Sequence, residues 1–212
     1  MTTFYLVRHG QSEGNLYGRF IGQGDVPLTE LGVMQAQKTA EHLKDVKFDL
    51  AYTSDLIRAR KTGEVVLGNR KMALVSAPNM REIFAGEWEG KTFDSLDIDY
   101  KESYALWKNE VGKASPDGGE PVSALYDRVN RFILEVAEQN EGATVLIATH
   151  ATPIRCIVAK ANGLPSERLH EIPWSPNSSV TVIGVENGKF SVISPSSADH
   201  LGDLATFLPK NV

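Results

Sequence analysis

The sequence predicts an α/β protein in which a mainly parallel sheet is covered by helices on both faces. The main observation is an alternation along the chain: short apolar runs of strand length are followed by longer segments with apolar residues at helical spacing. The chain also has 212 residues, of which 42% are apolar and 23% charged, as expected for a globular protein with a sizeable core. We therefore expect a single domain over residues 1–212.

The first predicted strand is the apolar run at residues 4–7, which stops abruptly at Arg8, His9 and Gly10. Residues 10–28 are rich in glycine and predict a long loop. A loop of this length in a compact domain usually serves function.

A helix is predicted over about residues 30–44, with Thr29 as its N-cap. Its approximate apolar face consists of Leu31, Met34, Ala40 and Leu43. Residues 48–53 then predict a second strand, because the helical pattern ends and a short apolar run follows.

The next predicted helix is capped by Ser54 or Asp55 and runs to about Leu67. Its inward face consists of Leu56, Ala59, Gly63 and Val66. Arg58 lies near the first turn and points away from that face. A third strand is predicted at residues 73–77.

Residues 93–121 have a different composition, rich in Asp, Lys, Tyr and Ser, and they end in SPDGGEP. We expect an inserted, partly helical cap over one end of the fold. The helix that follows has Ser123 as its predicted N-cap. Its apolar residues at helical spacing are Leu125, Val129, Phe132, Ile133 and Val136.

Residues 144–148 are the most strand-like run of the chain, and they end at Thr149 and His150. Pro153 is the predicted first residue of the next helix, and Gly163 ends it. The remaining segment, residues 179–194, predicts a hairpin with an Asn-Gly turn.

Ligands of parallel α/β sheets bind beyond the carboxyl ends of the strands. His9 and His150 both lie there, and so does the start of the helix that carries Arg58. The strands are thus expected to bring these residues to one edge of the sheet.

Arg8, His9, Arg58, Glu82 and His150 together are suited to phosphoryl transfer without a metal. Two guanidinium groups match the oxygens of a phosphoryl dianion. A neutral histidine attacks phosphorus through one ring nitrogen while the other is held protonated. A carboxylic acid protonates the departing alkoxide. Each residue alone also fits a structural role, so the hypothesis depends on their coincidence at element ends.

Composition argues against several other classes of protein. The net charge of −5 argues against general nucleic-acid binding. No signal segment opens the chain, and no apolar run has the length of a membrane span, so we expect a cytoplasmic protein without membrane contact. The single cysteine, Cys156, lies in an apolar stretch and is expected to be a buried thiol.

Five ordered motifs carry a family resemblance: LVRHGQSEGN, DVPLTELG, SDLIRARKT, REIFAGEWEG and IATHATPIR. Between about residues 4 and 160 the chain resembles the histidine phosphatase superfamily, in its phosphoglycerate-mutase-like branch. The resemblance implies a three-layer α/β/α sandwich with a variable cap, which corresponds to residues 93–121 and sets substrate choice.

The resemblance also implies roles for individual residues. His9 is expected to be the nucleophile that becomes phosphorylated, and Glu82 the general acid that later serves as base for water. Arg8, Arg58 and His150 are expected to hold the phosphoryl group. Further predicted phosphate-site residues are Asn15, Ile21, Gly22 and Ala151. No cofactor is expected.

The chain departs from the family pattern at three places. The last motif has Ala151 where glycine is usual, and Ile21 stands where relatives are often polar. Residues 90–121 contain four lysines but no arginine, whereas true mutases tend to carry an adjacent arginine pair that holds the substrate carboxylate. This last difference favours a phosphatase over a mutase.

We therefore expect a metal-independent phosphomonoesterase that acts on a small phosphorylated metabolite. The alternatives are a 2,3-bisphosphoglycerate-dependent phosphoglycerate mutase and a phosphate-binding relative without turnover. The substrate stays open, and the apolar strands near the C-terminus leave room for a homodimer. Five aromatic residues line either the pocket mouth or the core: Phe84, Trp88, Tyr104, Trp107 and Tyr126.

Overall fold

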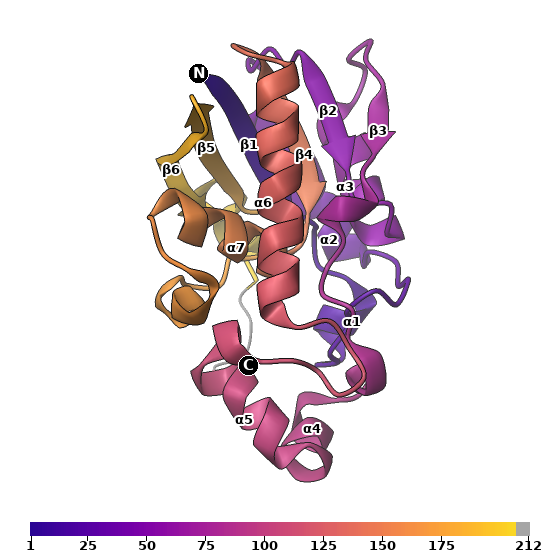
Figure 1. The fold of residues 1–212 in the computed structure, drawn as a ribbon. Helices are drawn as coiled ribbons and strands as arrows, with labels where there is room; N and C mark the ends of the chain where they lie inside the picture. Colours follow the sequence, from indigo (N-terminus) through magenta and orange to yellow (C-terminus); the bar gives the residue numbers. More distant parts are fainter. Residues whose placement is uncertain (207–212) are drawn as a thin grey trace.

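The computed structural model describes residues 1–206 and contains a six-stranded sheet of order β3-β2-β4-β1-β5-β6 (Figure 1). Strands β3, β2, β4 and β1 are parallel, and the hairpin β5–β6 joins β1 antiparallel. The strands are β1 (Thr2–Arg8), β2 (Leu50–Thr53), β3 (Leu74–Ser76), β4 (Thr144–Thr149), β5 (Val180–Glu186) and β6 (Lys189–Ser197). The end of the predicted 1–212 domain, residues 207–212, lies outside the described residues.

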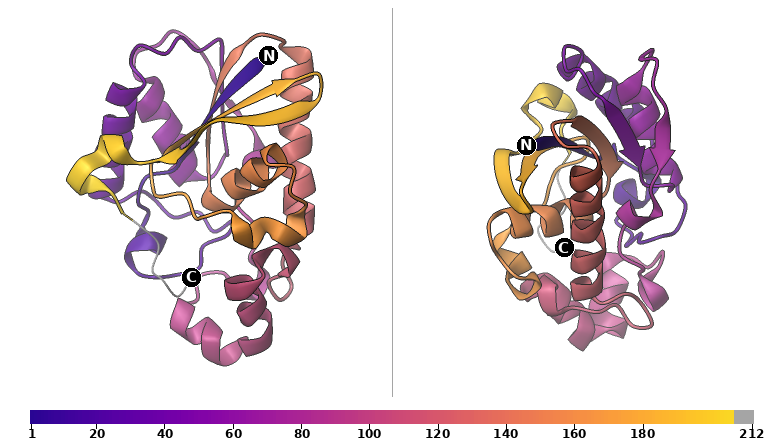
Figure 2. Two further views of the ribbon diagram at one scale, coloured as in Figure 1. Left: turned by 90° about the vertical axis from the view of Figure 1, so that its left-hand side faces the viewer. Right: turned by 45° about the horizontal axis from the view of Figure 1, so that its top comes forward.

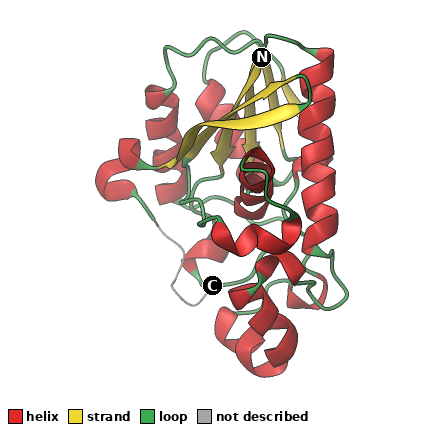
Figure 3. Cartoon of the chain, turned by 60° about the vertical axis from the view of Figure 1, so that its left-hand side comes forward, coloured by secondary structure: helices red, strands yellow, loops and turns green. Residues whose placement is uncertain are grey.

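Helices cover both faces of the sheet, so the predicted three-layer α/β/α fold class is confirmed (Figure 3). Helices α2 and α3 pack against each other on one face, and α6 and α7 on the other. The helices are α1 (Glu13–Leu16), α2 (Glu30–His42), α3 (Ile57–Leu67), α4 (Phe93–Asp99), α5 (Lys101–Asn109), α6 (Val122–Gln139) and α7 (Ala151–Ala161). No helix among residues 1–206 is both long and apolar enough to cross a membrane.

The alternation of side chains along the central strands explains why these strands are apolar throughout. Phe4 and Leu6 of β1 belong to the core cluster shared with α6 and α7. Val7 of the same strand belongs to a second cluster, together with Val66 and Leu67 of α3. The middle of β1 is therefore apolar, and polar residues stand at its two ends, Thr2 and Thr3 at the start and Arg8 at the finish.

The cap lies beyond the carboxyl ends of the parallel strands (Figures 1 and 2). It contains α4 and α5, as the predicted partly helical insertion requires. Its buried residues Leu96, Tyr104 and Trp107 belong to the same apolar cluster as Phe4 of the sheet. The cap is thus packed on the body of the protein by apolar contacts.

Three predicted helix starts are wrong by one or two residues. Helix α3 begins at Ile57 with no side-chain cap, because Ser54 and Asp55 are held by partners elsewhere. Helix α6 begins after Pro121, which places the predicted cap residue Ser123 inside the first turn. Helix α7 begins at Ala151, so Pro153 is its third residue, where the missing N–H costs nothing because first-turn N–H groups lack intrahelical acceptors.

The predicted apolar face of α2 is also partly wrong. Met34 is 44% exposed. Gln35 and Thr39 are buried instead, because they bond loop atoms at the end of the sheet. The Gln35 side-chain oxygen accepts from the N–H of Gln11 at 2.8 Å, and the Thr39 hydroxyl donates to the carbonyl of Ser178 at 3.0 Å. This face of α2 therefore supports loops through polar contacts.

Candidate active site

The two predicted histidines lie side by side because β1 and β4 are neighbours and end together. Arg8 pairs with Thr149 in the parallel register, and the N–H of His9 donates to the carbonyl of Thr149 at 2.9 Å. The rings of His9 and His150 have centroids 5.2 Å apart. Both side chains are buried. The edge of the sheet thus brings two residues 141 positions apart in the sequence (150 − 9) into contact.

His9 is held in one orientation and one tautomer. Its Nδ1 lies 2.7 Å from the carbonyl oxygen of Gly10. A carbonyl only accepts hydrogen bonds, so Nδ1 carries the proton and Nε2 carries the lone pair in the neutral ring. Burial lowers the pKa of His9 well below its ordinary value, and the nearby Arg58 and Arg8 lower it further. His9 is therefore a neutral imidazole at pH 7 with a free Nε2.

Gly10 follows His9 for a steric reason. A Cβ atom at this position would lie 2.2 Å from the carbonyl oxygen of Gly32 at the start of α2. The close approach of these two backbones requires glycine. The loop after β1 can therefore turn directly over the N-terminal end of α2.

Arg8 and Arg58 bring two buried cations to the same place. Both side chains are at most 2% exposed. Arg58 donates to the carbonyls of Gly22 at 2.7 Å and Gly24 at 2.8 Å, and Arg8 donates to the carbonyl of Ser175. Burial lowers the pKa of each to about 10, while Glu82 partly offsets this by raising it. Both guanidinium groups stay charged at neutral pH.

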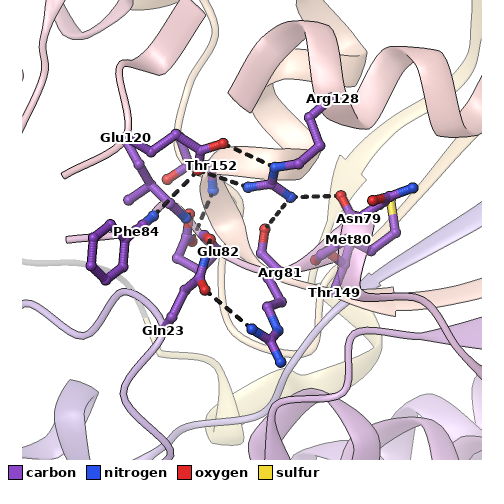
Figure 4. Close-up of polar contacts among 11 residues, drawn as sticks. Gln23, Asn79, Met80, Arg81, Glu82, Phe84, Glu120, Arg128, Thr149 and Thr152 are labelled. Atoms are coloured by element: carbon purple, nitrogen blue, oxygen red, sulfur yellow. Dashed lines mark hydrogen bonds and ion pairs between the residues drawn. The ribbon is translucent and has the colours of Figure 1, made fainter. Parts of the chain in front are cut away.

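Glu82 is the carboxylate of this cluster, and it is 8% exposed. One carboxylate oxygen accepts from the N–H of Ile83 at 2.8 Å, and the other from the N–H of Thr152 in the first turn of α7 at 3.2 Å (Figure 4). Two further glutamates that follow closely in the sequence, Glu87 and Glu89, have other partners. Glu87 accepts from Tyr100, and Glu89 accepts from the N–H groups of residues 22 and 23.

The segment that carries Glu82 is fixed to α6 by Arg128 and Glu120, which we call the Arg128 clamp (Figure 4). Arg128 donates to both carboxylate oxygens of Glu120, at 2.9 and 2.8 Å. It also donates to the carbonyls of Asn79 at 2.6 Å and Arg81 at 3.2 Å. The clamp therefore holds the chain directly before Glu82.

His150 is oriented by Ser54, at the end of β2. The Nε2 atom of His150 lies 2.8 Å from the Ser54 hydroxyl. Burial lowers the pKa of His150 well below its ordinary value, and the neighbouring Arg58, His9 and Arg8 lower it further. Its Nδ1 and the Nε of Arg8 are both buried without a hydrogen-bond partner among the described residues. Buried polar atoms normally have partners, so these two atoms mark a place suited to a ligand.

A loop that the sequence reading missed, residues 175–179, encloses Arg8 and His9. The Asn177 amide donates to the carbonyl of His9 and to the side-chain oxygen of Asn15, both at 3.1 Å. The N–H of Ser178 also donates to the carbonyl of His9, at 3.1 Å. This loop precedes β5, and β5 is antiparallel to β1, so its start lies at the end of β1. The position of this loop therefore follows from the hairpin that the sequence predicts.

The pocket at this edge combines most of the predicted site residues with an apolar wall. The predicted residues that line it are Arg8, His9, Asn15, Ile21, Arg58, Glu82 and Ala151. Two predicted site residues, Gly22 and His150, are not among the lining residues. The N–H and the carbonyl of Gly22 are bonded to Glu89 and Arg58, and His150 lies behind the lining, bonded to Ser54. Lining residues not predicted for the site are Ser12, Arg19, Phe20, Ile83, Phe93, Thr152 and Trp174.

The five aromatic residues that the sequence left open divide between core and pocket. Trp88, Tyr104 and Tyr126 are buried in the core. Trp107 belongs to the core and lines the pocket as well. Phe84 is 48% exposed, so it belongs neither to the core nor to the pocket lining. The remaining histidines, His42 and His200, stack on each other at 4.6 Å outside the pocket lining, and His170 does not line it either.

The charges of the pocket suit an anion. Arg8 and Arg58 face a single buried carboxylate, that of Glu82. Among residues 1–206, no group of three or more His, Cys, Asp or Glu side chains is arranged to hold a metal ion. A group with two or more negative oxygens matches the two guanidinium forks and the neutral imidazoles beside them.

Comparison with protein families gives one match over most of the chain. Residues 4–196 match the family described as "Histidine phosphatase superfamily (branch 1)". The adenosylcobalamin/alpha-ribazole phosphatase of Escherichia coli (strain K12) is 33% identical over 165 residues, 78% of this chain and 81% of that protein. Phosphoserine phosphatase 1 of Hydrogenobacter thermophilus is 29% identical over 96% of both chains.

The chain is also similar to a mutase relative and to a solved structure. The probable phosphoglycerate mutase GpmB of Photorhabdus laumondii is 32% identical over 78% of this chain and 77% of its own length. The structure of YhfR from Bacillus stearothermophilus superposes with a TM-score of 0.88 and 32% identity, over 93% of this chain and 99% of that chain.

Proposed function

Because the chain belongs to the histidine phosphatase superfamily, we propose that it is a metal-independent phosphomonoesterase that works through a phosphohistidine on His9. Its substrate would be a small phosphorylated metabolite. The observation that carries the proposal is the tautomer of His9. The Gly10 carbonyl holds the proton on Nδ1, which leaves the lone pair of Nε2 free in a pocket with two buried arginines.

Substrate binding in this proposal uses polar side-chain atoms at this edge of the sheet, two of which lack a partner within the described chain. Arg8 and Arg58 bind the phosphoryl oxygens through their guanidinium groups. The Nε of Arg8 and the Nδ1 of His150 gain partners that they lack within the described chain. Asn15 contributes its amide nitrogen, because its oxygen already accepts from Ser12 and Asn177.

In the first chemical step, Nε2 of His9 attacks phosphorus and the bond from phosphorus to the leaving oxygen breaks. Glu82, which enters this step as the carboxylic acid, gives its proton to the leaving oxygen. Negative charge on the equatorial oxygens is stabilised by Arg8 and Arg58. The products are the alcohol and a phosphoryl group bonded to Nε2.

In the second step, the Glu82 carboxylate takes a proton from a water molecule that attacks the phosphohistidine. The bond from phosphorus to Nε2 breaks, and inorganic phosphate leaves. His9 returns to the neutral tautomer because its proton stays on Nδ1, hydrogen-bonded to the Gly10 carbonyl, throughout. The proton from water returns Glu82 to the carboxylic acid that the next cycle needs.

The mutase alternative is supported by the similarity to the probable phosphoglycerate mutase GpmB. A mutase must bind the carboxylate of a phosphoglycerate and return the phosphoryl group to it. Three of the four cap lysines have other partners: Lys91 lies over the ring of Tyr100, Lys108 pairs with Asp97, and Lys113 pairs with Glu110. Hydrolysis needs only access for water, which supports the phosphatase.

Phosphorus NMR of the protein in EDTA tests the proposal. The mixture contains 3-phosphoglycerate, a trace of 2,3-bisphosphoglycerate and an aryl phosphate, with His9→Ala as control. Growth of inorganic phosphate that the His9→Ala variant abolishes is the expected result. Growth of 2-phosphoglycerate means a mutase instead, and phosphate release that stops in EDTA contradicts metal independence. Binding of phosphate by a folded protein without any turnover means a phosphate-binding relative.

A further inference from the structure

The pocket continues beyond the phosphate site along four aromatic side chains, which we call the aromatic wall: Phe20, Phe93, Trp107 and Trp174. The rings of Phe20 and Trp107 have centroids 4.9 Å apart, and those of Trp107 and Trp174 are 5.9 Å apart with a tilt of 33°. The wall thus combines residues from the first loop, the cap and the segment before β5.

Trp174 is joined directly to the phosphate site. It precedes Ser175, whose carbonyl accepts a hydrogen bond from Arg8. Trp107 reaches the same pocket from α5 of the cap. A substrate with its phosphoryl group on Arg8 therefore has these two indole rings beside its leaving group.

Arg155 of α7 packs against the ring of Trp174. Its guanidinium carbon lies 3.9 Å from the centroid of the Trp174 ring. The same side chain is 3% exposed and donates to the carbonyls of Ile172 at 2.8 Å and Leu169 at 3.0 Å. Arg155 lies about one turn after Ala151 and Thr152, so one helix supports both the phosphate end and the aromatic end of the pocket.

Charge beside the aromatic wall is sparse. Apart from Arg8 and Arg58, the one cationic side chain among the described lining residues is Arg19. One of its terminal nitrogens already donates to the carbonyl of Gly90 at 2.8 Å. A leaving group with a carboxylate or an ammonium thus finds few charged partners beside the wall, whereas a flat ring finds four aromatic side chains.

We propose that the preferred substrates are phosphomonoesters whose leaving alcohol carries a flat, uncharged aromatic ring. This inference rests on the proposed function. The ring packs against Trp174 and Trp107, where aromatic contacts add to the burial of apolar surface. Arg155 is a positioning residue in this arrangement, because it holds Trp174 in place and touches no substrate itself.

A series of alkyl phosphates with chemically similar leaving oxygens tests the inference. The substrates are 2-phenylethyl phosphate, 2-cyclohexylethyl phosphate, glycerol 3-phosphate and 3-phosphoglycerate, and the readout is kcat/KM for release of inorganic phosphate. We expect 2-phenylethyl phosphate to exceed glycerol 3-phosphate and 3-phosphoglycerate by at least about tenfold, and the cyclohexyl compound by about threefold or more.

Variants of the wall show whether the preference comes from these residues. Trp174→Leu should raise KM for 2-phenylethyl phosphate about tenfold, with kcat nearly unchanged, while the kinetics with glycerol 3-phosphate change less than twofold. Trp174→Phe should restore most of the loss. Arg155→Met should give a smaller rise in the same KM, also without a change for glycerol 3-phosphate. Phe84→Leu replaces an exposed aromatic side chain outside the pocket and serves as the matched control.

The outcomes separate this inference from the proposed function. Equal kcat/KM values across the series, or a preference for 3-phosphoglycerate, overturn the aromatic preference while phosphatase activity stands. Equal values for the phenyl and cyclohexyl compounds also overturn it, because the pocket then selects apolar volume and not a flat ring. Loss of the phenyl preference in Phe84→Leu contradicts the assignment to the aromatic wall. No phosphate release from any compound by the folded protein, including a generic aryl phosphate, overturns the proposed function itself.

Discussion

Replacing Arg128 with methionine removes four hydrogen bonds: two to the Glu120 carboxylate, and two to backbone carbonyls of the chain that leads to Glu82. Methionine retains part of the apolar stem of arginine, so the change acts mainly on the polar contacts. The Glu120 carboxylate loses its charged partner and, among residues 1–206, keeps only the N–H of Phe84 as a donor, at 3.3 Å. We expect a less stable protein in which Glu82 is poorly placed.

The cost in stability follows from the burial of the pair. Removing one partner of a fully buried ion pair costs about 3–5 kcal/mol of unfolding free energy. The side chains of Arg128 and Glu120 are still 22% and 17% exposed, so water reaches the remaining carboxylate in part. We therefore expect a loss of about 2–3 kcal/mol. For a chain of this size that corresponds to a fall in Tm of about 4–12 °C.

The catalytic effect is expected to appear in kcat. The clamp bonds the carbonyls of Asn79 and Arg81, and Glu82 follows directly. General acid catalysis contributes about 10²–10⁴-fold, and a displaced acid loses part of this. We expect kcat to fall about tenfold or more, while KM changes less than about threefold, because Arg8 and Arg58 are not touched.

The assay combines urea unfolding with steady-state kinetics at a temperature where the variant is fully folded. Arg168→Met is the matched control, since it removes an arginine bonded twice to Glu171 on the surface, where the side chains are 55% and 37% exposed. We expect no measurable change for that control, as is usual for exposed pairs. If Arg128→Met lowers the unfolding free energy no more than Arg168→Met does, or if kcat is unchanged in the folded variant, the clamp does not position Glu82.

Three further predictions concern the loop 175–179, the histidines and the phosphate pocket. Asn177→Ala removes the donor to the His9 carbonyl and to Asn15, and should lower kcat about tenfold. Thr206→Val removes the donor to the Asn177 oxygen and an acceptor of the Gln35 amide but leaves the Asn177 amide in place, and should show a smaller loss in the same kinetic assay. The pKa of His9 and of His150 is lowered in the fold, so the unfolded chain binds more protons just below pH 6.5. The unfolding free energy from urea titrations should therefore fall as the pH decreases there, by at most about 1.4 kcal/mol per pH unit for each histidine. A loss of stability as the pH rises through this window would contradict the burial of neutral imidazoles. Inorganic phosphate at about 100 times its Kd should stabilise the protein by about 2.7 kcal/mol in a thermal shift assay, and this gain should vanish in Arg8→Met; an equal gain in the variant would place the anion elsewhere.

The fold and the centre of the site could be predicted from the chain because both depend on local patterns. His9 and His150 each follow a continuous apolar run, and parallel strands that are buried on both faces bring their ends to one edge. Arg58 follows β2 within the first turn of α3, so its place depends on the same rule. Glu82 was suggested by the chemistry of phosphoryl transfer, which needs a carboxylic acid, and the family resemblance implied its place, since no periodic pattern surrounds it.

The residues that support the site could not be predicted in this way. Arg128 bonds backbone carbonyls 47 and 49 positions earlier, and Asn177 bonds a carbonyl 168 positions earlier. Any residue can supply a carbonyl acceptor, so such contacts leave no signature in the sequence. The helix starts failed for a related reason: Ser54 caps no helix because its hydroxyl is bonded to His150, a contact that only the assembled sheet creates.

The aromatic wall is an intermediate case. The sequence places Trp107 in the core or at the pocket, and the structure places it in both. Phe20, Phe93 and Trp174 are not predicted as pocket residues from the sequence. These three come from separate segments of the chain, and only the packing of the cap over the sheet brings them together. Their common position beside Arg8 is a property of the tertiary structure alone.

The central claim is that His9 carries the phosphoryl group during turnover. The most direct measurement mixes the protein with an aryl phosphate in EDTA, stops the reaction with alkali after milliseconds, and maps the phosphorylated peptide by mass spectrometry. The predicted result is a single phosphoryl group on His9, formed and lost at rates that account for turnover, and absent from His9→Ala. Turnover by His9→Ala at the rate of the unaltered protein, or a phosphoryl group on another residue, would contradict the account.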